Sequence, residues 1–463
     1  MKPSGALFSI FMVSISGLGC TSNWNTKLPA SSELGTPRGY QIARTIIHLH
    51  SPYSYDACDR AGLGKDGTPN AECLSHLRSA LCSNHIDAAF LTDHPHHMAE
   101  KTFEELLLYK SGDTLLLNGG DPYANQLEAC EDGHQTVLSV GYEDRLMPIG
   151  MTAHLAGTTA QRLTDYVTET SAFVTQLKTD TSAIVIVPHT ESRSDTLLST
   201  LGMDGIEVFN IHANIDPKIR GRHLRLDYFD RFSDLLPYWI DPFHEESPDL
   251  AWLSLFQLSD VYAEKWDKLL GAGSKVFGTG GSDAHENTIK SKTSDGERVD
   301  SYRRLMRWVS NHFLVSSRTY ANIKSAVGAG RSWIVFEGFG TPVGMDFYAD
   351  NGTTLYNPGE TGTYAAGTTT LNLKLPSLHK NSPQGDRSPV IHAFLYKVNS
   401  DGTRTLVASS TGGGDIRYTV PAVGIYRAVV TITPLHLADF MNYDRQKAFA
   451  EAPWILTNPV YLQ

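Results

Sequence analysis

The sequence predicts an α/β fold in which repeated strand–helix units build a parallel sheet or barrel, followed by an all-β segment. Between Gln41 and about Gly338, short apolar runs alternate with amphipathic segments, and polar residues of the kinds that bind metals follow those runs. After Gly338 the pattern changes to short strands of alternating apolar residues, separated by Gly, Asn and Asp turns. The first pattern predicts the strand–helix part and the second predicts the β part.

The apolar runs give the expected strands in order. They cover Thr45–His50, Asp87–Thr92, Thr136–Tyr142, Ala183–Pro188, Gly205–Phe209 and Lys275–Thr279. The fourth is continuously apolar, as a strand buried on both faces should be. Between the first two runs, Leu74, Leu77 and Leu81 recur at helical spacing, which predicts a helix over Cys73–Leu81 with its apolar stripe towards the core.

Histidines and carboxylates lie just after these runs. His48 and His50 are two residues apart, and Asp56 follows six residues later. Alternate side chains of a strand share a face about 6–7 Å apart, so two imidazoles can meet one metal at about 2.1 Å per bond. Two histidines packed at a strand end explain this pair equally well. The same kind of residue recurs after later runs, and these candidates are His94, Glu143, His154, His189, Asp283 and His285.

The carboxyl ends of parallel strands meet at one rim, where active sites are built from loops. We therefore expect these candidates to share one site. Four further histidines are expected to be surface or packing residues, namely His76, His85, His223 and His312.

The order of these motifs resembles the PHP superfamily, named for polymerase and histidinol phosphatase domains. The motifs are HxH with an acid six residues on, TDH, a Glu followed by a His, an apolar strand ending in PH, and SDAH. The resemblance covers roughly His48 to Gly338. It implies a distorted (β/α)7 barrel that holds up to three metal ions.

The resemblance also implies the ligands of each metal. The first metal's ligands are His48, His50, Glu143 and Asp283; the second's are Glu143, His154 and His189; the third's are Asp56, His94 and His285. In this scheme Glu143 bridges two ions.

The chemistry of the donors can be argued without the family. Nitrogen and carboxylate ligands suit Zn, Mn or Fe, and ligand softness does not choose among them. Metals that share a carboxylate lower the pKa of a water between them, which makes hydrolysis the expected reaction. We expect two or three divalent ions, with Glu143 and Asp283 serving catalysis as well as metal binding. No GxSxG elbow or Cys/His pair calls for a covalent mechanism.

Substrate contacts are less specific in the sequence. Arg193 is the strongest single candidate for a catalytic or substrate-binding cation, because it follows His189 by four residues. The basic segment Pro217–His223 fits phosphate recognition and a solvated loop equally well. His96, His97 and His212 are expected at the same rim, where contact with substrate and contact with solvent alone both fit. Asp93 fits either a role in orienting a metal ligand or a structural cap.

The start of the chain resembles an export signal. Residues 1–19 contain one cation, an apolar core too short for a permanent membrane span, and small residues before Cys20. That arrangement is similar to a bacterial lipobox, which implies a membrane-anchored envelope lipoprotein; ordinary secretion with an unlipidated Cys20 is the alternative. Residues 20–38, rich in Ser, Thr, Asn and Pro, are expected to be a flexible tether.

Composition fits an exported globular protein. The net charge of −11 and the lack of a basic stripe exclude a nucleic-acid surface, so the expected partner is a small ester or phosphoester, and any membrane contact is through a lipid on Cys20. Cys58, Cys73, Cys82 and Cys130 form an even set that could make two disulfides, with three pairings open. A zinc site of four thiolates is disfavoured by their irregular spacing.

Alternating apolar residues after Gly338 predict a β-sandwich, and the expected domains are 39–338 for the barrel and 339–463 for the sandwich. Pro453–Tyr461 resembles the final strand of exported PHP proteins in the CehA/McbA group, some of which are associated with carbamate-ester hydrolysis. The sandwich is expected to buttress the barrel, with carbohydrate binding as the alternative.

Two functional hypotheses follow. The favoured one is a cell-envelope metallohydrolase that cleaves a phosphoester, or a carboxyl or carbamate ester, and the competing one is a non-catalytic lipoprotein that binds metal or ligand.

Overall fold

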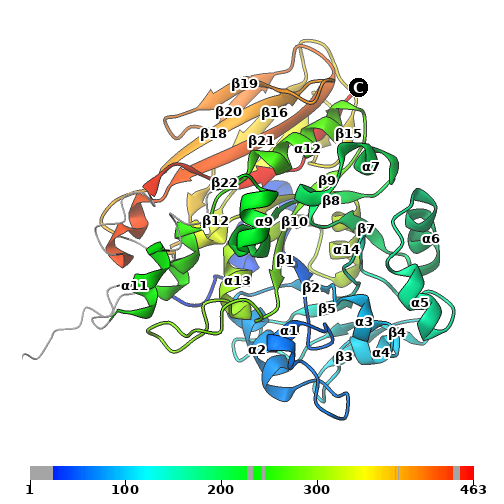
Figure 1. Cartoon of the computed structure of the whole chain (residues 1–463). Helices are drawn as coiled ribbons and strands as arrows, with labels where there is room; N and C mark the ends of the chain where they lie inside the picture. Colours follow the sequence, from blue (N-terminus) through cyan, green and yellow to red (C-terminus); the bar gives the residue numbers. More distant parts are fainter. Residues whose placement is uncertain (1–23, 227–232, 242–245, 381, 384, 442–448) are drawn as a thin grey trace, which may run out of the picture.

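The computed structural model describes residues 24–226, 233–241, 246–380, 382–383, 385–441 and 449–463 (Figure 1). The expected export signal and Cys20 lie outside the described residues.

A ring of seven strands organises the first part of the chain. Its members are β1 (Gln41–Leu49), β2 (Ala88–Leu91), β5 (Val137–Val140), β6 (Met147–Ile149), β7 (Ile184–Val187), β8 (Gly205–Asn210) and β9 (Phe277–Ala284).

Six pairings and one bridge close the ring. Strand β1 pairs in parallel with β2 and β9, β2 with β5, and β8 with both β7 and β9, whereas β6 is antiparallel to β7. The Met151 N–H donates to the Val140 carbonyl at 2.8 Å, which joins β5 to the segment after β6. The strands therefore form a closed barrel. Every expected strand of this region is present, and the fold is a mixed α/β one.

Two elements of the barrel region were not expected. Strand β6 has only three residues, and the hairpin of β3 (Thr114–Asn118) and β4 (Asp121–Gln126) extends the sheet beyond β5. The turn residues Gly119 and Gly120 both have positive φ, which glycine adopts without strain. Strand β6 is too short to give a periodic signal. Of the hairpin strands, β3 has an apolar run of only three residues and β4 consists mainly of polar residues, so neither gives the longer apolar run of a buried strand.

Helices cover the outside of the ring (Figure 1). The helix α2 (Ala71–Ser83) begins at Asn70, whose side chain accepts the N–H groups of Glu72 and Cys73, and it buries the predicted leucine stripe. The other α-helices described in this part are α1 (Ala57–Arg60), α3 (Pro95–Met98), α4 (Phe103–Leu106), α5 (Thr159–Asp165), α6 (Ser171–Thr181), α7 (Asp195–Thr200), α8 (Ile211–Ile215), α9 (Pro217–Arg222), α11 (Leu236–Trp239), α12 (Asp260–Gly271), α13 (Tyr302–Trp308) and α14 (Tyr320–Gly328).

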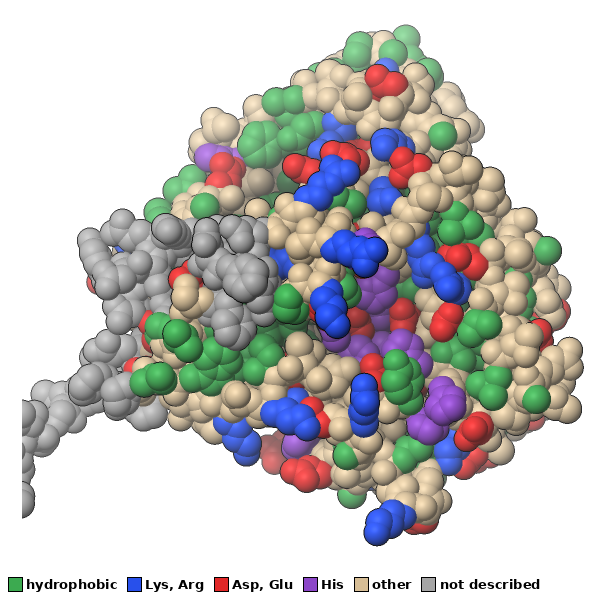
Figure 2. All heavy atoms as spheres, in the orientation of Figure 1, with side chains coloured by type: hydrophobic (Ala, Val, Ile, Leu, Met, Phe, Trp, Pro, Cys, Tyr) green, Lys and Arg blue, Asp and Glu red, His purple; other side chains and the backbone are tan. Residues whose placement is uncertain are grey.

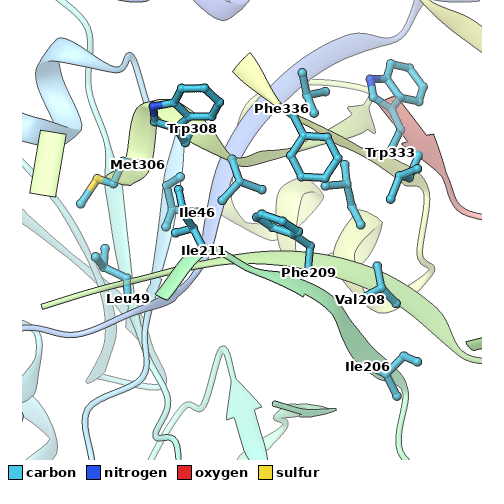
Figure 3. Close-up of a cluster of buried hydrophobic side chains, with 14 of the residues drawn as sticks. Ile46, Leu49, Ile206, Val208, Phe209, Ile211, Met306, Trp308, Trp333 and Phe336 are labelled. Atoms are coloured by element: carbon cyan, nitrogen blue, oxygen red, sulfur yellow. The ribbon is translucent and has the colours of Figure 1, made fainter. Parts of the chain in front are cut away.

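The ring strands are apolar on both faces. One buried cluster contains Ile47, Phe90 and Ile186, and α14 packs against it through Ile323 and Val327. The opposite faces belong to a larger core that includes β8, α13 and the strands that follow them, part of which is shown in Figure 3. Burial on both faces explains why these strands read as continuous apolar runs in the sequence.

The larger core joins the barrel region to the C-terminal strands. Strand β1 also pairs antiparallel with β10 (Ser310–Val315), which pairs with β11 (Ser332–Val335), and β11 pairs with β22 (Ala452–Thr457). The Phe209 ring of β8 contacts Phe336 with ring centroids 4.8 Å apart, and both rings appear in Figure 3. One sheet is therefore continuous from the barrel region into the last strands of the chain.

The C-terminal region is made almost entirely of strands. One group continues the large sheet and consists of β15 (Thr361–Gly362), β18 (Val390–Val398), β19 (Arg404–Ser410), β21 (Gly424–Thr433), β22 and β23 (Val460–Leu462). A second, four-stranded sheet consists of β13 (Asp346–Asp350), β14 (Leu355–Tyr356), β16 (Thr370–Lys374) and β20 (Ile416–Thr419). A short pair is formed by β12 (Pro342–Val343) and β17 (Ser377–Leu378). A buried ion pair joins α12 to β21, since the Arg427 Nη2 lies 2.9 Å from the Asp267 Oδ2.

Residues 24–38 do not form the flexible tether expected from their composition. Leu28 and Leu34 are buried in the structure, and Arg38 Nε lies 2.8 Å from the Asp346 Oδ2. The composition of a segment does not reveal apolar contacts or ion pairs with distant parts of the chain. This explains why the expectation differs from the structure.

Two disulfides lie in the first third of the chain, Cys58–Cys73 and Cys82–Cys130. They resolve the pairing that the sequence left open. Cross-links that close loops of this length typically stabilise a fold by roughly 3 to 4 kcal/mol. Within the part of the chain that the structure describes, no helix has the length and apolar character needed to cross a bilayer.

Candidate metal centre

His48 lies at a bulge of β1. Ile47 and Leu49 belong to the two opposite cores, although strict alternation would place them on the same face. The register of β1 with β2 and β9 shifts between these residues, and His48 between them has φ +69°. One additional residue in a strand redirects a side chain. As a result the His48 and His50 rings lie near each other, with centroids 5.3 Å apart.

Two other candidates also have left-handed backbone. His189 follows β7 with φ +49°, and Asp283 lies inside β9 with φ +48°. Each non-glycine residue in this region costs roughly 1–2 kcal/mol. Such strain persists where the surroundings fix the conformation, and it concentrates at functional sites. For His189 the surroundings include Glu207, whose Oε2 accepts the His189 N–H at 2.9 Å.

Imidazole nitrogens surround the Asp283 carboxylate. Its Oδ1 lies 3.2 Å from the Nε2 atoms of both His48 and His50. Its Oδ2 lies 3.4 Å from the His189 Nε2 and 3.9 Å from the His212 Nδ1. Residues from β1, β9 and the segments after β7 and β8 thus meet at one carboxylate.

A second carboxylate holds the neighbouring group together. The Nε2 atoms of His94 and His285 each lie 3.6 Å from the Asp56 Oδ2. The His94 Nδ1 lies 2.9 Å from the Glu143 Oε2, and the Glu143 Oε1 lies 3.8 Å from the His189 Nε2. Glu143 therefore stands between the two parts of the site.

Four overlapping sets of side chains have ligand atoms close enough to hold a metal ion. They are His50, Asp56, His94 and His285; His48, His50 and Asp283; His48, Glu143 and His189; and His212, Asp283 and His285. Most of the separations between these atoms exceed an ordinary hydrogen bond. With bonds of about 2.1 Å, ligands of one ion are about 3.0–3.4 Å apart in octahedral or tetrahedral geometry. The separations of 3.2–3.4 Å between Asp283 and His48, His50 and His189 match that spacing, whereas the 3.9 Å separation from His212 is slightly longer.

The unpaired nitrogens of the site agree with this interpretation. The Nε2 atoms of His48 and His50 are buried and have no hydrogen-bond partner among the described residues. Leaving a polar atom buried and unpaired costs about 1–3 kcal/mol. A cation between these nitrogens and the Asp283 carboxylate would satisfy them, so the donor set fits divalent metals.

Charges within the site keep its carboxylates ionised. Burial raises the pKa of Asp283, but His48 and His285 outweigh this effect and hold the pKa well below its ordinary value. Burial likewise raises the pKa of Glu143, while the hydrogen bond from His94 lowers it to about 2. Ionised carboxylates are the form that binds cations at neutral pH.

The pKa of His48 is shifted in the opposite direction to those of the two carboxylates. Burial lowers the pKa of His48, but the Asp283 and Glu207 carboxylates raise it to about 10. Two anions on one imidazole indicate a site with excess negative charge, which is the environment that a cation requires.

The structure does not bring His154 to the other candidates. Its Nδ1 lies 2.9 Å from the Tyr166 hydroxyl and its Nε2 lies 3.0 Å from the Lys101 carbonyl, so both ring nitrogens are engaged. Burial lowers the pKa of His154 to about 4. The expectation that His154 serves as a metal ligand therefore finds no support in the geometry, because its segment packs against α4 and α5 instead.

Arg193 is placed beside a carboxylate rather than among the ligands. Its Nη1 lies 3.2 Å from the Glu169 Oε1, and its Nη2 donates to the carbonyl of Arg145 at 3.3 Å. The basic segment Pro217–His223 contains α9. Its Arg220 side chain is buried and donates to the carbonyls of Asn214 and Leu255. Arg220 is therefore a structural residue.

Asp93 acts on the loop that follows His50. Its carboxylate accepts the N–H and the hydroxyl of Ser51, each at 2.6 Å. These hydrogen bonds support a structural capping role for Asp93 rather than a role in orienting a metal ligand.

Three residues near the ligands carry roles that the sequence motifs did not indicate. Glu207 Oε1 lies 2.8 Å from the His48 Nδ1, and Glu191 Oε1 lies 3.0 Å from the His189 Nδ1. His212, considered only as a rim residue, contacts Asp283. The available signals were a lone acid inside the apolar run of β8 and an acid two residues after the PH motif. Such carboxylates fix the tautomer and orientation of histidine ligands.

The site opens at one face of the molecule. Figure 2 shows histidine side chains gathered in a hollow with acidic side chains among them, and Lys and Arg side chains stand around it. The centre is therefore negatively charged and has cations at its edge.

Comparisons with known proteins give little further information. No protein-family model matches the sequence, and no curated protein matches it. Among solved structures, the chain is similar to a crystal structure of a two-domain protein from Bacteroides vulgatus that contains a predicted PHP-like metal-dependent phosphoesterase. The identity is 11%, the match covers 89% of this chain and 94% of that chain, and the TM-score is 0.34. A likeness at that TM-score supports no conclusion about this chain.

Proposed function

We propose that this protein is a metal-dependent hydrolase that cleaves a phosphoester. The observation that carries the proposal is the Asp283 carboxylate, which lies 3.2 Å from two buried imidazole nitrogens that have no hydrogen-bond partner among the described residues. Such a combination is costly without a cation and stable with one. The motif order that resembles the PHP superfamily, and the barrel type that this resemblance implies, agree with the proposal.

The ligand assignment follows the sets of close donor atoms. His48, His50 and Asp283 form one set, His48, Glu143 and His189 a second. The third set contains His50, Asp56, His94 and His285. Two or three divalent ions of Zn, Mn or Fe type would be held there, and bound ions would supply Lewis acidity and a hydroxide nucleophile at neutral pH.

The chain's own residues have separate tasks in this reaction. Glu207 and Glu191 accept hydrogen bonds from the Nδ1 side of His48 and His189, which leaves the Nε2 atoms directed at the site. Glu143 and Asp283, held ionised by the neighbouring histidines, balance the positive charge of the ions. The cations around the hollow attract an anionic phosphoester.

A metal-exchange and turnover assay tests the proposal. Purified protein is stripped with EDTA, reloaded with Mn²⁺, Zn²⁺ or Fe²⁺, and assayed with p-nitrophenyl phosphate, bis(p-nitrophenyl) phosphate, p-nitrophenyl acetate and a naphthyl carbamate. We expect phosphoester turnover that EDTA abolishes and metal restores. Asp283→Asn should lose both metal and turnover, whereas Asp401→Asn, an exposed acid of the C-terminal region, should lose neither.

The other outcomes select among alternatives. Turnover confined to the acetate or the carbamate would assign the same centre to carboxyl or carbamate esters, as the CehA/McbA resemblance suggests. Metal retained at stoichiometric amounts without turnover of any ester would favour a non-catalytic binding protein. Failure to bind any of the three metals would overturn the proposal.

We also propose that the protein is exported and retained at the cell envelope through a lipid on Cys20. The two disulfides support export, because such bonds persist in oxidising compartments. Residues 339–463 are proposed to be a β-sandwich that buttresses the hydrolase part, and the buried Asp267–Arg427 pair supports that role. Metabolic labelling with a fatty acid, compared between the natural chain and Cys20→Ser, tests the lipid.

A further inference from the structure

A cavity of about 330 Å³ lies directly beside the candidate metal centre. It is lined by Tyr55, Asp56, Asp59, Arg60, Asn287 and Lys290. Asp56 belongs both to this cavity and to the ligand set with His94 and His285. The Asn287 Nδ2 donates to the Asp56 Oδ2 at 3.3 Å, so the wall of the cavity is connected to a ligand atom.

One wall of this cavity is a strained segment. Cys58, Asp59 and Arg60 have φ values of +49°, +59° and +68°, so three consecutive non-glycine residues adopt left-handed backbone. L-residues avoid this conformation, and runs of it are not formed by local preference. The surroundings must therefore impose the shape.

Several contacts fix the segment in place. Cys58 is bonded to Cys73 of α2, and its N–H donates to the His285 carbonyl at 2.7 Å. The Asp59 N–H donates to the Glu286 carbonyl at 3.0 Å. The segment is thus tied to the same loop that carries the metal-ligand candidate His285. Strain held in place beside a reactive centre is typical of residues with a functional task.

Charge is distributed unevenly in the cavity. The Asp59 Oδ2 lies 2.6 Å from the Arg298 Nη1, which neutralises that acid. The Lys290 Nζ is 3.6 Å from the same oxygen, but its side chain is 74% exposed, so this contact is weak. The Arg60 side chain is exposed and makes no hydrogen bond or ion pair with any described residue. Two cations therefore remain available beside the metal centre.

From these observations we infer that Arg60 and Lys290 form a subsite for a second phosphate group of the substrate. The inference rests on the proposed phosphoesterase function and narrows it to bisphosphorylated substrates. In this arrangement one phosphoester group binds at the metal centre, and the second phosphate group binds in the cavity on the other side of Asp56. There the planar guanidinium group of Arg60 can bind two phosphate oxygens at once. Lys290 contributes as a point charge.

A pair of matched substrates tests the subsite. Propane-1,3-diol bisphosphate and propane-1,3-diol monophosphate differ only in the second phosphate group, and released phosphate is measured with the metal-loaded protein. We expect kcat/KM to be at least about tenfold higher for the bisphosphate, because one hydrogen bond between charged groups typically strengthens binding by about that factor. Arg60→Ala should remove most of this preference and leave kcat/KM for the monophosphate within about twofold.

Further variants separate charge, geometry and folding. Arg60→Lys keeps the charge but loses the fork, so its preference should be intermediate. Lys290→Ala should lower kcat/KM for the bisphosphate by about threefold, which is the size of a solvent-exposed contact. Arg417→Ala, an exposed cation on β20, should change nothing. If Arg60→Ala does not fold, the exposed Lys290 still provides the test.

The outcomes distinguish this inference from the function on which it rests. Equal kcat/KM for the two substrates, or an equal loss for both in Arg60→Ala, would overturn the subsite while hydrolysis itself stands. Absence of phosphate release from both substrates and from p-nitrophenyl phosphate would overturn the proposed function.

Discussion

The Oε1 of Glu207 lies 2.8 Å from the Nδ1 of His48, and both side chains are fully buried. The other carboxylate oxygen of Glu207 accepts the backbone N–H of His189 at 2.9 Å. One acid in the middle of β8 thereby positions two metal-ligand candidates, the ring of His48 and the backbone of the residue after β7. Its negative charge also makes the facing imidazole a stronger donor towards a cation.

We expect Glu207→Gln to weaken metal binding by about 10- to 100-fold, because the neutral amide neither fixes the His48 tautomer nor increases its basicity. Competition against a chelator of known affinity measures the change. Glu337→Gln is the matched control, since Glu337 is equally buried but pairs with Arg44. That control should lower stability and leave metal affinity unchanged. Wild-type affinity in Glu207→Gln would contradict the positioning role.

The glycine opposite this pair has its own requirement. A Cβ at Gly281 would lie 1.9 Å from the Glu207 Oε1 and 3.1 Å from the His48 Cβ. We therefore expect Gly281→Ala to displace the Glu207 side chain and to lose metal, with a cost of about 2 kcal/mol or more in the free energy of unfolding from overpacking. Metal content and urea unfolding measure the two effects.

Gly221→Ala is the control for that substitution. Gly221 is exposed in α9, and a Cβ there would meet nothing within 4 Å. Alanine in a helix is favoured over glycine by about 1 kcal/mol, so this variant should be as stable as the natural chain or more so. Full metal content in Gly281→Ala would contradict the steric argument.

Much of the barrel region could be predicted from sequence because buried strands leave continuous apolar runs. The rim location of His50, His94, His189 and Asp283 followed from the same pattern, since parallel strands end at one edge. The reason for the convergence of His48 with His50 differed from the expectation. In this structure the strand is not regular at that point, because a bulge at His48 reverses the alternation between Ile47 and Leu49 and sets the direction of the His48 side chain. Bulges have no periodic signature.

Other features depend on contacts between distant residues and leave no local pattern. Glu207 reads as an isolated acid in an apolar strand until the fold places it against His48. Residues 24–38 have the composition of a linker, yet Leu34 is completely buried and its carbonyl accepts the N–H of Gly344, far along the chain, at 3.0 Å. The left-handed run at Cys58–Arg60 is imposed by a disulfide and by the loop after β9, so no local preference predicts it.

His154 provides a test of the ligand assignment itself. Both of its ring nitrogens are engaged by Tyr166 and Lys101, so we expect His154→Gln to retain its metal and to lose only about 1 kcal/mol of stability from altered hydrogen bonds. His189→Gln should lose metal, because the His189 Nε2 faces Asp283. Metal content after dialysis compares the two. Equal metal loss in both variants would place His154 at the centre after all.

A pH dependence is expected from His436, which lies far from the metal-ligand candidates in sequence and is buried against the Phe339 carbonyl. Burial lowers the pKa of His436 to about 4 from its ordinary value of 6.5. The unfolded chain therefore takes up a proton below pH 6.5 that the folded chain accepts only near pH 4. This contribution to stability is complete above pH 6.5 and is lost as the pH falls towards 4, by up to about 3 kcal/mol.

Urea unfolding of metal-free protein at pH 7, 5.5 and 4.5 tests this prediction. The free energy of unfolding of His436→Gln should fall less steeply with decreasing pH, while His96→Gln, which changes an exposed residue of α3, should follow the natural chain. Parallel profiles for the natural chain and His436→Gln would show that His436 does not resist protonation in the folded state.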